Sequence, residues 1–80
     1  MKKTWHRPQR NLCGSAIKGA RLRCKPPVSQ DDLAGRLAGL GLSIDQTALS
    51  RIERGERYLM DVELIAIAKA LRVSTASLLP

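Results

Sequence analysis

The stretch DQTALSRIERG, which runs from Asp45 to Gly55, carries the clearest structural pattern in this sequence. When it is placed on a helix at about 100° per residue, its apolar residues fall on one side. These residues are Ala48, Leu49 and Ile52. Asp45 can cap the start of the helix because its side chain accepts from free backbone N–H groups, and Gly55 can end it in the left-handed conformation. The stretch therefore predicts a short amphipathic helix.

The opposite side of this helix is polar and is a candidate surface for nucleic acid. It carries amide, hydroxyl and guanidinium groups, from Gln46, Thr47, Ser50, Arg51 and Arg54. Amide and guanidinium groups pair with base edges, and all of these groups can bind phosphate oxygens. The same side would also suit an ordinary helix that faces solvent. The neighbouring sequence has to decide between the two interpretations.

Length and composition favour one small helical domain. The chain has 80 residues, with one Trp, one Tyr and no Phe, so its core must be built from aliphatic side chains. That composition suits packed helices better than a β-sandwich. No apolar run approaches the roughly 20 residues that a membrane span needs. The basic N-terminal residues lack the apolar segment of a signal peptide, so we expect a cytoplasmic protein.

The sequence predicts neither a metal or cofactor site nor a catalytic site. Cys13 and Cys24 are too few and too oddly spaced for a disulfide framework or a zinc site, and we expect small buried thiols. The single histidine is His6, within an irregular basic segment. No Ser, Cys or carboxylate group has a base placed beside it by the motif pattern. An enzyme is therefore not expected.

Positive charge is concentrated at the start of the chain. The net charge of +7 comprises +8 from residues 1–25, which contain no acid, and −1 from residues 26–80. A basic segment on a nearly neutral body suggests a polyanionic partner, most simply nucleic acid, although such a segment can also be a solubilising tail. Residues 1–10 show no helical periodicity and contain Pro8. We interpret them as a flexible arm that could reach into a groove of DNA, with Trp5 either an anchor or a contact to a partner.

Residues 11–80 predict five helices in one compact domain. The first begins at the cap Asn11 and runs to about Cys24, and the second begins at Ser29, with Asp32 completing a near-capping box. The third is the stretch described above. The fourth begins at Asp61, and a short fifth begins at Ser74. The buried side of the fourth helix is predicted to comprise Leu64, Ile65, Ile67, Ala68 and Leu71.

Three segments in this order resemble the lambda-repressor-like, Cro/cI-type helix-turn-helix family, also called the xenobiotic-response-element family. They are SQDDLA at 29–34, ALSRIERG at 48–55 and IAKALRVS at 67–74, and the resemblance covers about residues 16–79. It implies an all-α, five-helix, sequence-specific regulator that binds double-stranded DNA. Residues 45–54 would form the recognition helix in the major groove. Operators of the family are usually two-fold symmetric, so a homodimer is implied.

The resemblance also implies roles for individual residues. Gln30 matches a position that holds a phosphate at the start of the first motif helix. Gln46, Thr47 and Arg51 match positions that reach base edges, whereas Ser50 could serve bases or phosphate. Arg54 and Arg57 match positions with frequent backbone contacts. Arg21 and Glu53 match positions that commonly form an ion pair beneath the recognition helix.

The spacing departs from the family pattern. From Gln30 to Arg51 is 21 positions, which is longer than in the usual compact motif. The additional residues lie around Ala38–Ser43. They predict about one additional turn on the second helix and a longer connection that contains glycine.

Two functions remain open at this point. The first is a DNA-binding transcriptional regulator, and the second is a protein-interaction module of the same fold, such as an antitoxin or an anti-repressor. RNA binding is disfavoured because the sequence offers no aromatic stacking platform. We expect no separate dimerisation domain, so a homodimer would use this body, through Leu78 and Leu79 or through the Tyr58–Met60 loop.

Overall fold

The chain, described here from a computed structural model, is defined over residues 9–80, and these residues form only helices and connecting loops. The elements are α1 (Gly14–Arg23), α2 (Gln30–Gly39), α3 (Gln46–Glu53), α4 (Asp61–Leu71) and the 3-10 helix η1 (Thr75–Leu78). The all-α class is confirmed. The predictions for Trp5, for His6 and for most of the basic arm lie outside the described residues.

The predicted fifth helix is not an α-helix. Residues 75–78 form a single 3-10 turn, capped by Ser74, whose side chain accepts from the backbone N–H of Ser77. Its backbone bonds span three residues, as from Ser77 N–H to Ser74 O at 3.1 Å. The segment is too short for an α-helix to develop after its first turn. The described residues therefore contain four α-helices and one 3-10 helix.

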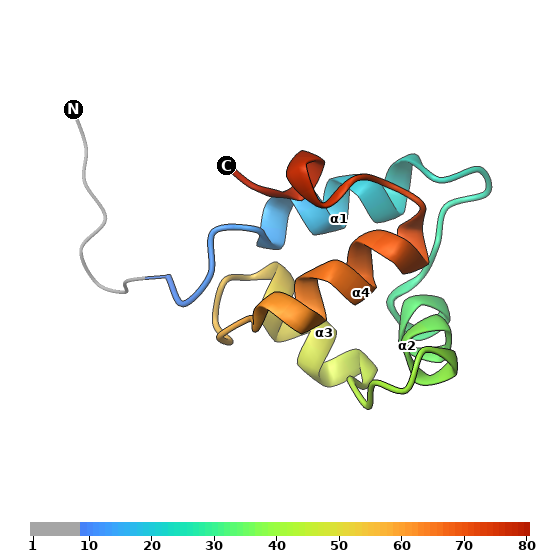
Figure 1. The fold of residues 1–80 in the computed structure, drawn as a ribbon, viewed down its shortest axis with the longest axis horizontal. Helices are drawn as coiled ribbons and strands as arrows, with labels where there is room; N and C mark the ends of the chain where they lie inside the picture. Colours follow the sequence, from blue (N-terminus) through green and yellow to red (C-terminus); the bar gives the residue numbers. More distant parts are fainter. Residues whose placement is uncertain (1–8) are drawn as a thin grey trace.

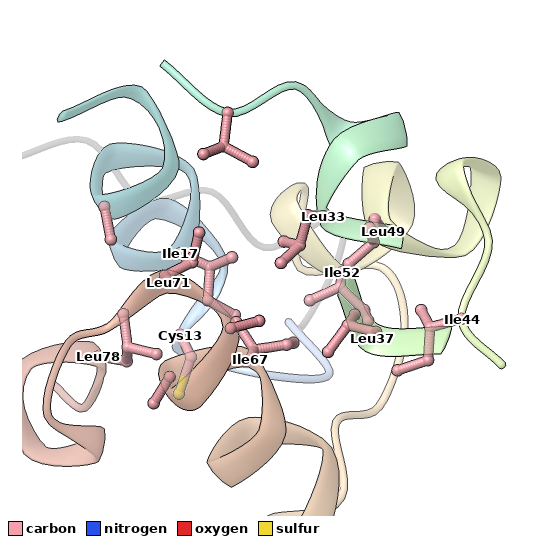
Figure 2. Close-up of a cluster of buried hydrophobic side chains, with 14 residues drawn as sticks. Cys13, Ile17, Leu33, Leu37, Ile44, Leu49, Ile52, Ile67, Leu71 and Leu78 are labelled. Carbon is pink, nitrogen blue, oxygen red and sulfur yellow. The ribbon is translucent and has the colours of Figure 1, made fainter. Parts of the chain in front are cut away.

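The helices enclose one aliphatic core. Figure 1 shows α4 in the middle of the molecule, with α1 and η1 along one side of it and α2 and α3 along the other. Figure 2 shows side chains from all of these elements meeting in the centre. The largest fully buried side chains are Ile17, Leu33, Leu37, Leu49, Ile52, Ile67 and Leu78. Burying such a side chain stabilises a fold by about 1.5–3 kcal/mol, so this cluster fixes how α2 and α3 lie on the rest of the domain.

The ends of α2 and α3 follow the local signals in the sequence. Ser29 and Asp32 form a capping box, with Ser29 Oγ accepting from the Asp32 N–H at 2.9 Å. The Asp45 carboxylate accepts from the Ala48 N–H at 2.8 Å and so caps α3. Gly55 follows α3 with a φ of 75°, which closes the helix in a left-handed turn. The predicted starts of α2 and α3 are confirmed.

The connection between α2 and α3 runs over residues 40–45. Gly41 adopts a φ of 89°, which an L side chain would strain, and its N–H donates to Ala38 O at 3.0 Å. Ile44 is buried in the core. The connection is therefore an ordered path between the two helices, and the glycine within it ends α2.

Two local predictions were wrong. Asn11 does not cap α1, which begins at Gly14, because its side-chain oxygen accepts instead from the Cys13 N–H at 2.9 Å, before the helix begins, while its side-chain N–H groups reach the far end of α3. They donate to Ile52 O at 3.0 Å and to Arg57 O at 2.8 Å. Ile65 is not in the core but 51% exposed, because α4 turns that position away from the other helices.

The two cysteines are free thiols, with Cys13 buried and Cys24 half-buried. Within residues 9–80, no helix is both long enough and apolar enough to cross a membrane.

Candidate nucleic-acid interface

An ion pair joins α1 to α3 beneath the polar side of α3. The Arg21 guanidinium donates to Glu53 through Nε at 2.8 Å and through Nη2 at 2.9 Å. A third bond runs from Arg21 Nη1 to Val28 O at 2.9 Å. The two side chains are only 9% and 4% exposed. Hydrogen bonding to Glu53 raises the pKa of Arg21 above its usual value, so the guanidinium stays charged.

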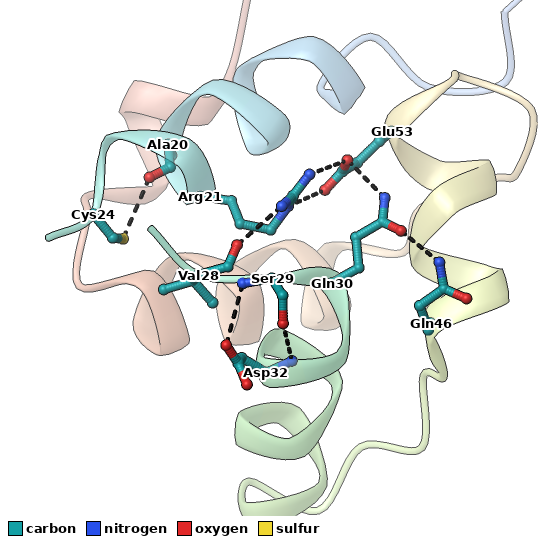
Figure 3. A network of polar contacts seen from close by, with 9 residues as sticks. All are labelled: Ala20, Arg21, Cys24, Val28, Ser29, Gln30, Asp32, Gln46 and Glu53. Carbon is teal, nitrogen blue, oxygen red and sulfur yellow. Dashed lines mark hydrogen bonds and ion pairs between the residues drawn. The ribbon is translucent and has the colours of Figure 1, made fainter. Parts of the chain in front are cut away.

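Two glutamine side chains extend this pair towards solvent. Gln30, at the start of α2, donates through Nε2 to Glu53 Oε1 at 2.9 Å. Gln46, at the start of α3, donates through Nε2 to Gln30 Oε1 at 2.6 Å. Figure 3 shows the four side chains of Arg21, Glu53, Gln30 and Gln46 in one continuous series across the three helices. The first turns of α2 and α3 are thus held together by side chains as well as by core packing.

The remaining polar side chains of α3 divide into two groups. Thr47 and Arg51 are exposed, and among residues 9–80 the Arg51 side chain has no hydrogen bond or ion pair. Arg54 donates to Ser50 Oγ at 2.6 Å and pairs with Glu56 at 3.2 Å, while its own side chain is 56% exposed. The Arg51 side chain is therefore available to contact a ligand in solvent, whereas the Arg54 side chain is held along the helix by Ser50 and Glu56.

Ser50 and Arg54, unlike Thr47 and Arg51, border a hollow between α1, α2 and α3. Lys18, Gln30, Gln46, Ser50 and Arg54 line it, together with the Arg21–Glu53 pair. Asp31 also lines it and opposes the positive charge of Lys18 and Arg54. The surface at this end of the fold offers amide, hydroxyl and cationic donors side by side, which are the groups that bind phosphates and base edges.

Arg57 lies apart from this surface. Its guanidinium donates to both carboxylate oxygens of Glu63 on α4, at 3.1 and 3.2 Å. Hydrogen bonding raises the pKa of Arg57 and lowers that of Glu63. Glu63 also accepts from the Met60 N–H at 3.0 Å, at the start of α4. The Arg57 side chain therefore fastens the loop after α3 to α4.

Sequence reasoning missed the partners of Gln30, Gln46 and Arg57. A signal was present for Glu63, since an acid in the first turn of a helix is a natural partner for a cation in the preceding loop. No comparable signal joins Gln30 to Gln46. Their contact depends on how the two helices pack.

The fold and this arrangement of α2 and α3 define a helix-turn-helix domain. Residues 21–78 match the family model HTH_3, described as helix-turn-helix. The chain belongs to this family, which is of the Cro/cI or lambda-repressor-like type. The family binds DNA and is normally non-enzymatic, and membership indicates a DNA-binding transcriptional regulator in general. No curated protein and no solved structure matches the chain significantly.

Proposed function

We propose that this protein is a transcriptional regulator that binds double-stranded DNA sequence-specifically, with α3 in the major groove. The observation that carries the proposal is the series of hydrogen bonds that ends at Gln46. The amide of Gln46 is held by Gln30, which is held by Glu53, which is held by the buried Arg21. An amide whose orientation is fixed before binding loses less entropy when it pairs with a base.

The neighbouring residues supply the other contacts of the proposed interface. Gln46 and Arg51 can pair bidentately with adenine and guanine, and Thr47 can contact a base or a thymine methyl group. Ser50, Arg54 and the backbone N–H groups in the first turn of α2 would bind phosphates, while the Gln30 side chain positions Gln46. Because Arg57 is held by Glu63 at both oxygens, its contribution to DNA binding would require that pair to open.

The basic arm would act beside the same duplex. The Arg10 N–H donates to Gly55 O at 2.9 Å, and the Arg10 guanidinium lies 5.6 Å from the centre of the Tyr58 ring. Through these two contacts Arg10 holds the start of the described chain against the C-terminal end of α3. The Lys and Arg residues that precede it in sequence would add phosphate contacts without base preference.

A two-fold symmetric operator would require two copies of the chain. Leu78 is buried and closes the core, which leaves Leu79 of the two leucines considered for a dimer contact. Tyr58 and Met60 are 71% and 61% exposed, and Val62 on α4 is exposed as well. We place the dimer contact at this apolar surface after α3, where it would set the spacing of the two recognition helices.

Selection of binding sites from random duplexes at one moderate salt concentration tests the proposal directly. An enriched motif is expected, and its absence would overturn sequence-specific binding. Affinity for the selected site should fall with salt, with a logarithmic slope of about −0.9 for each phosphate contacted. Binding that is weak and flat across salt and sequence would favour the alternative, an interaction module such as an antitoxin or an anti-repressor.

Two variants separate the proposed roles within that assay. Arg51→Ala should relax the preference at one position in each half-site, at a cost of about 1–3 kcal/mol. Deletion of residues 2–8, which leaves Arg10 in place, should weaken binding on all sequences and reduce the salt slope. If both variants caused the same uniform loss, the division between base contacts and phosphate contacts would be wrong.

A further inference from the structure

A second hollow, of about 590 Å³, lies where the C-terminal ends of α1 and α4 meet α2. Three cationic side chains line it, from Lys25 after α1, Arg36 on α2 and Arg72 after α4. It shares no lining residue with the hollow beside Gln30 and Gln46. This basic hollow plays no part in the interface proposed for DNA.

The three positive charges of the basic hollow are not balanced by acidic side chains or by the helix C-termini beside it. No acidic residue lines it, and among residues 9–80 neither Lys25, Arg36 nor Arg72 forms an ion pair. Cations near helix C-termini complement the helix dipole, and each terminus supplies about half a negative charge. Two termini against three cations leave about two positive charges for an external anion.

One of the three cations is held through its side chain, and a second is held through its backbone alone. Arg36 Nη1 donates to Ala70 O at 2.9 Å, which holds the guanidinium at the edge of the hollow and leaves its other N–H groups available. Arg72 has a left-handed backbone, with φ 59°, and its N–H donates to Lys69 O at 3.1 Å. Guanidinium groups bind carboxylates through paired hydrogen bonds, and prior positioning reduces the entropy lost on binding.

The rest of the lining comes from Cys24, Pro26, Ala70 and Leu71, whose side chains are apolar. A surface of this kind fits a peptide that offers carboxylates and an apolar side chain together. The sugar-phosphate backbone of DNA offers neither. Figure 3 shows Cys24 and Gln46 on opposite sides of the view, with Arg21 and Gln30 between them. A duplex bound to α3 would therefore leave the basic hollow accessible. Only this accessibility in the DNA complex rests on the proposed function.

We propose that the basic hollow binds an acidic peptide segment of a protein partner, with Lys25, Arg36 and Arg72 pairing with its carboxylates. The partner could then be engaged while DNA occupies α3. The regulator would have two separate binding surfaces, one for the operator and one for an acidic protein.

A titration of the isotope-labelled full chain with the peptide Glu-Glu-Leu-Glu-Glu, followed by NMR, tests this without DNA. Amide shifts should move around residues 24–26, 36 and 70–72, and the peptide Gln-Gln-Leu-Gln-Gln should not produce them. Lys25→Gln and Arg36→Gln should each weaken binding by about two- to fivefold, the range for exposed ion pairs. Lys25→Gln should fold like the parent, because among residues 9–80 the Lys25 side chain makes no hydrogen bond or ion pair. A loss of peptide binding in this variant would therefore not result from unfolding.

The matched control is Lys69→Gln, which removes an exposed cation of α4 outside the hollow and should leave the peptide affinity unchanged. Equal weakening by this control would reduce the site to general charge attraction and overturn the proposal. A second titration uses the complex with a selected duplex, where the peptide affinity should be the same. If DNA displaced the peptide, or if Lys25→Gln lowered the DNA affinity and its salt slope, the hollow would be a phosphate site instead.

Discussion

Gln46 of α3 donates a hydrogen bond of 2.6 Å to the side-chain oxygen of Gln30 at the start of α2. Through Gln30 and Glu53 the same series reaches Arg21, whose side chain is almost fully buried. One end of the network therefore belongs to the core and the other to the surface proposed for DNA. Changes at the two ends should have different consequences, and the first two predictions concern this difference.

Gln30→Ala should reduce the discrimination that Gln46 exerts at one base pair. Without Gln30 the Gln46 amide can rotate, so the expected loss is about 1 kcal/mol, or roughly fivefold in affinity for the preferred site. The measurement is a double-mutant cycle of Gln30→Ala and Gln46→Ala on the selected operator. The double variant should bind about as well as Gln46→Ala alone. Additive losses would show that Gln30 contacts DNA independently of Gln46.

Glu53→Ala should destabilise the fold by about 3–5 kcal/mol, because it leaves the Arg21 guanidinium buried without its partner. Urea denaturation measures the change. Asp31→Ala is a useful control, since it removes an exposed acid that makes no hydrogen bond or ion pair within residues 9–80 and should cost about 1 kcal/mol or less. If Glu53→Ala melted like the parent and had lost DNA binding, the pair would be functional and not structural.

Local signals predicted the starts of α2 and α3 and the end of α3 correctly. Ser29 with Asp32, and Asp45 with Gly55, act through bonds that form wherever such a helix forms. Asn11 shows where this reasoning fails, because carbonyl groups more than 40 positions away orient its side chain, and its oxygen then accepts from Cys13 instead of from the first turn of α1. Neither those carbonyl groups nor the partner of Gln46 can be read from local sequence, because both depend on tertiary packing.

The Arg57–Glu63 pair should make stability depend on pH. Hydrogen bonds from Arg57 hold the pKa of Glu63 below the ordinary 4.5, so folding favours the charged form. The stabilisation is present above the unfolded-state pKa and is lost as pH falls through the lower folded-state pKa. Glu63→Gln should therefore cost about 1–2 kcal/mol at neutral pH and progressively less in acid. Urea denaturation across this range measures the difference, and a cost that did not change with pH would contradict it.

Two glycines in different surroundings should respond oppositely to the same substitution. An added Cβ at Gly14 would lie 2.5 Å from Ile52 O and 2.6 Å from Glu53 O, both backbone atoms at the end of α3. Gly14→Ala should therefore push α1 away from α3 and cost about 1–3 kcal/mol. At Gly35, in the exposed middle of α2, an added Cβ meets nothing within 4 Å.

Gly35→Ala should stabilise the protein by about 0.5–1 kcal/mol, because alanine favours the helix and clashes with nothing. Thermal denaturation of the two variants side by side measures both effects. DNA affinity should fall only in Gly14→Ala, since that variant alone displaces the helix that carries Gln46. Equal stability of the two variants would mean that α1 and α3 do not approach as closely as these distances require.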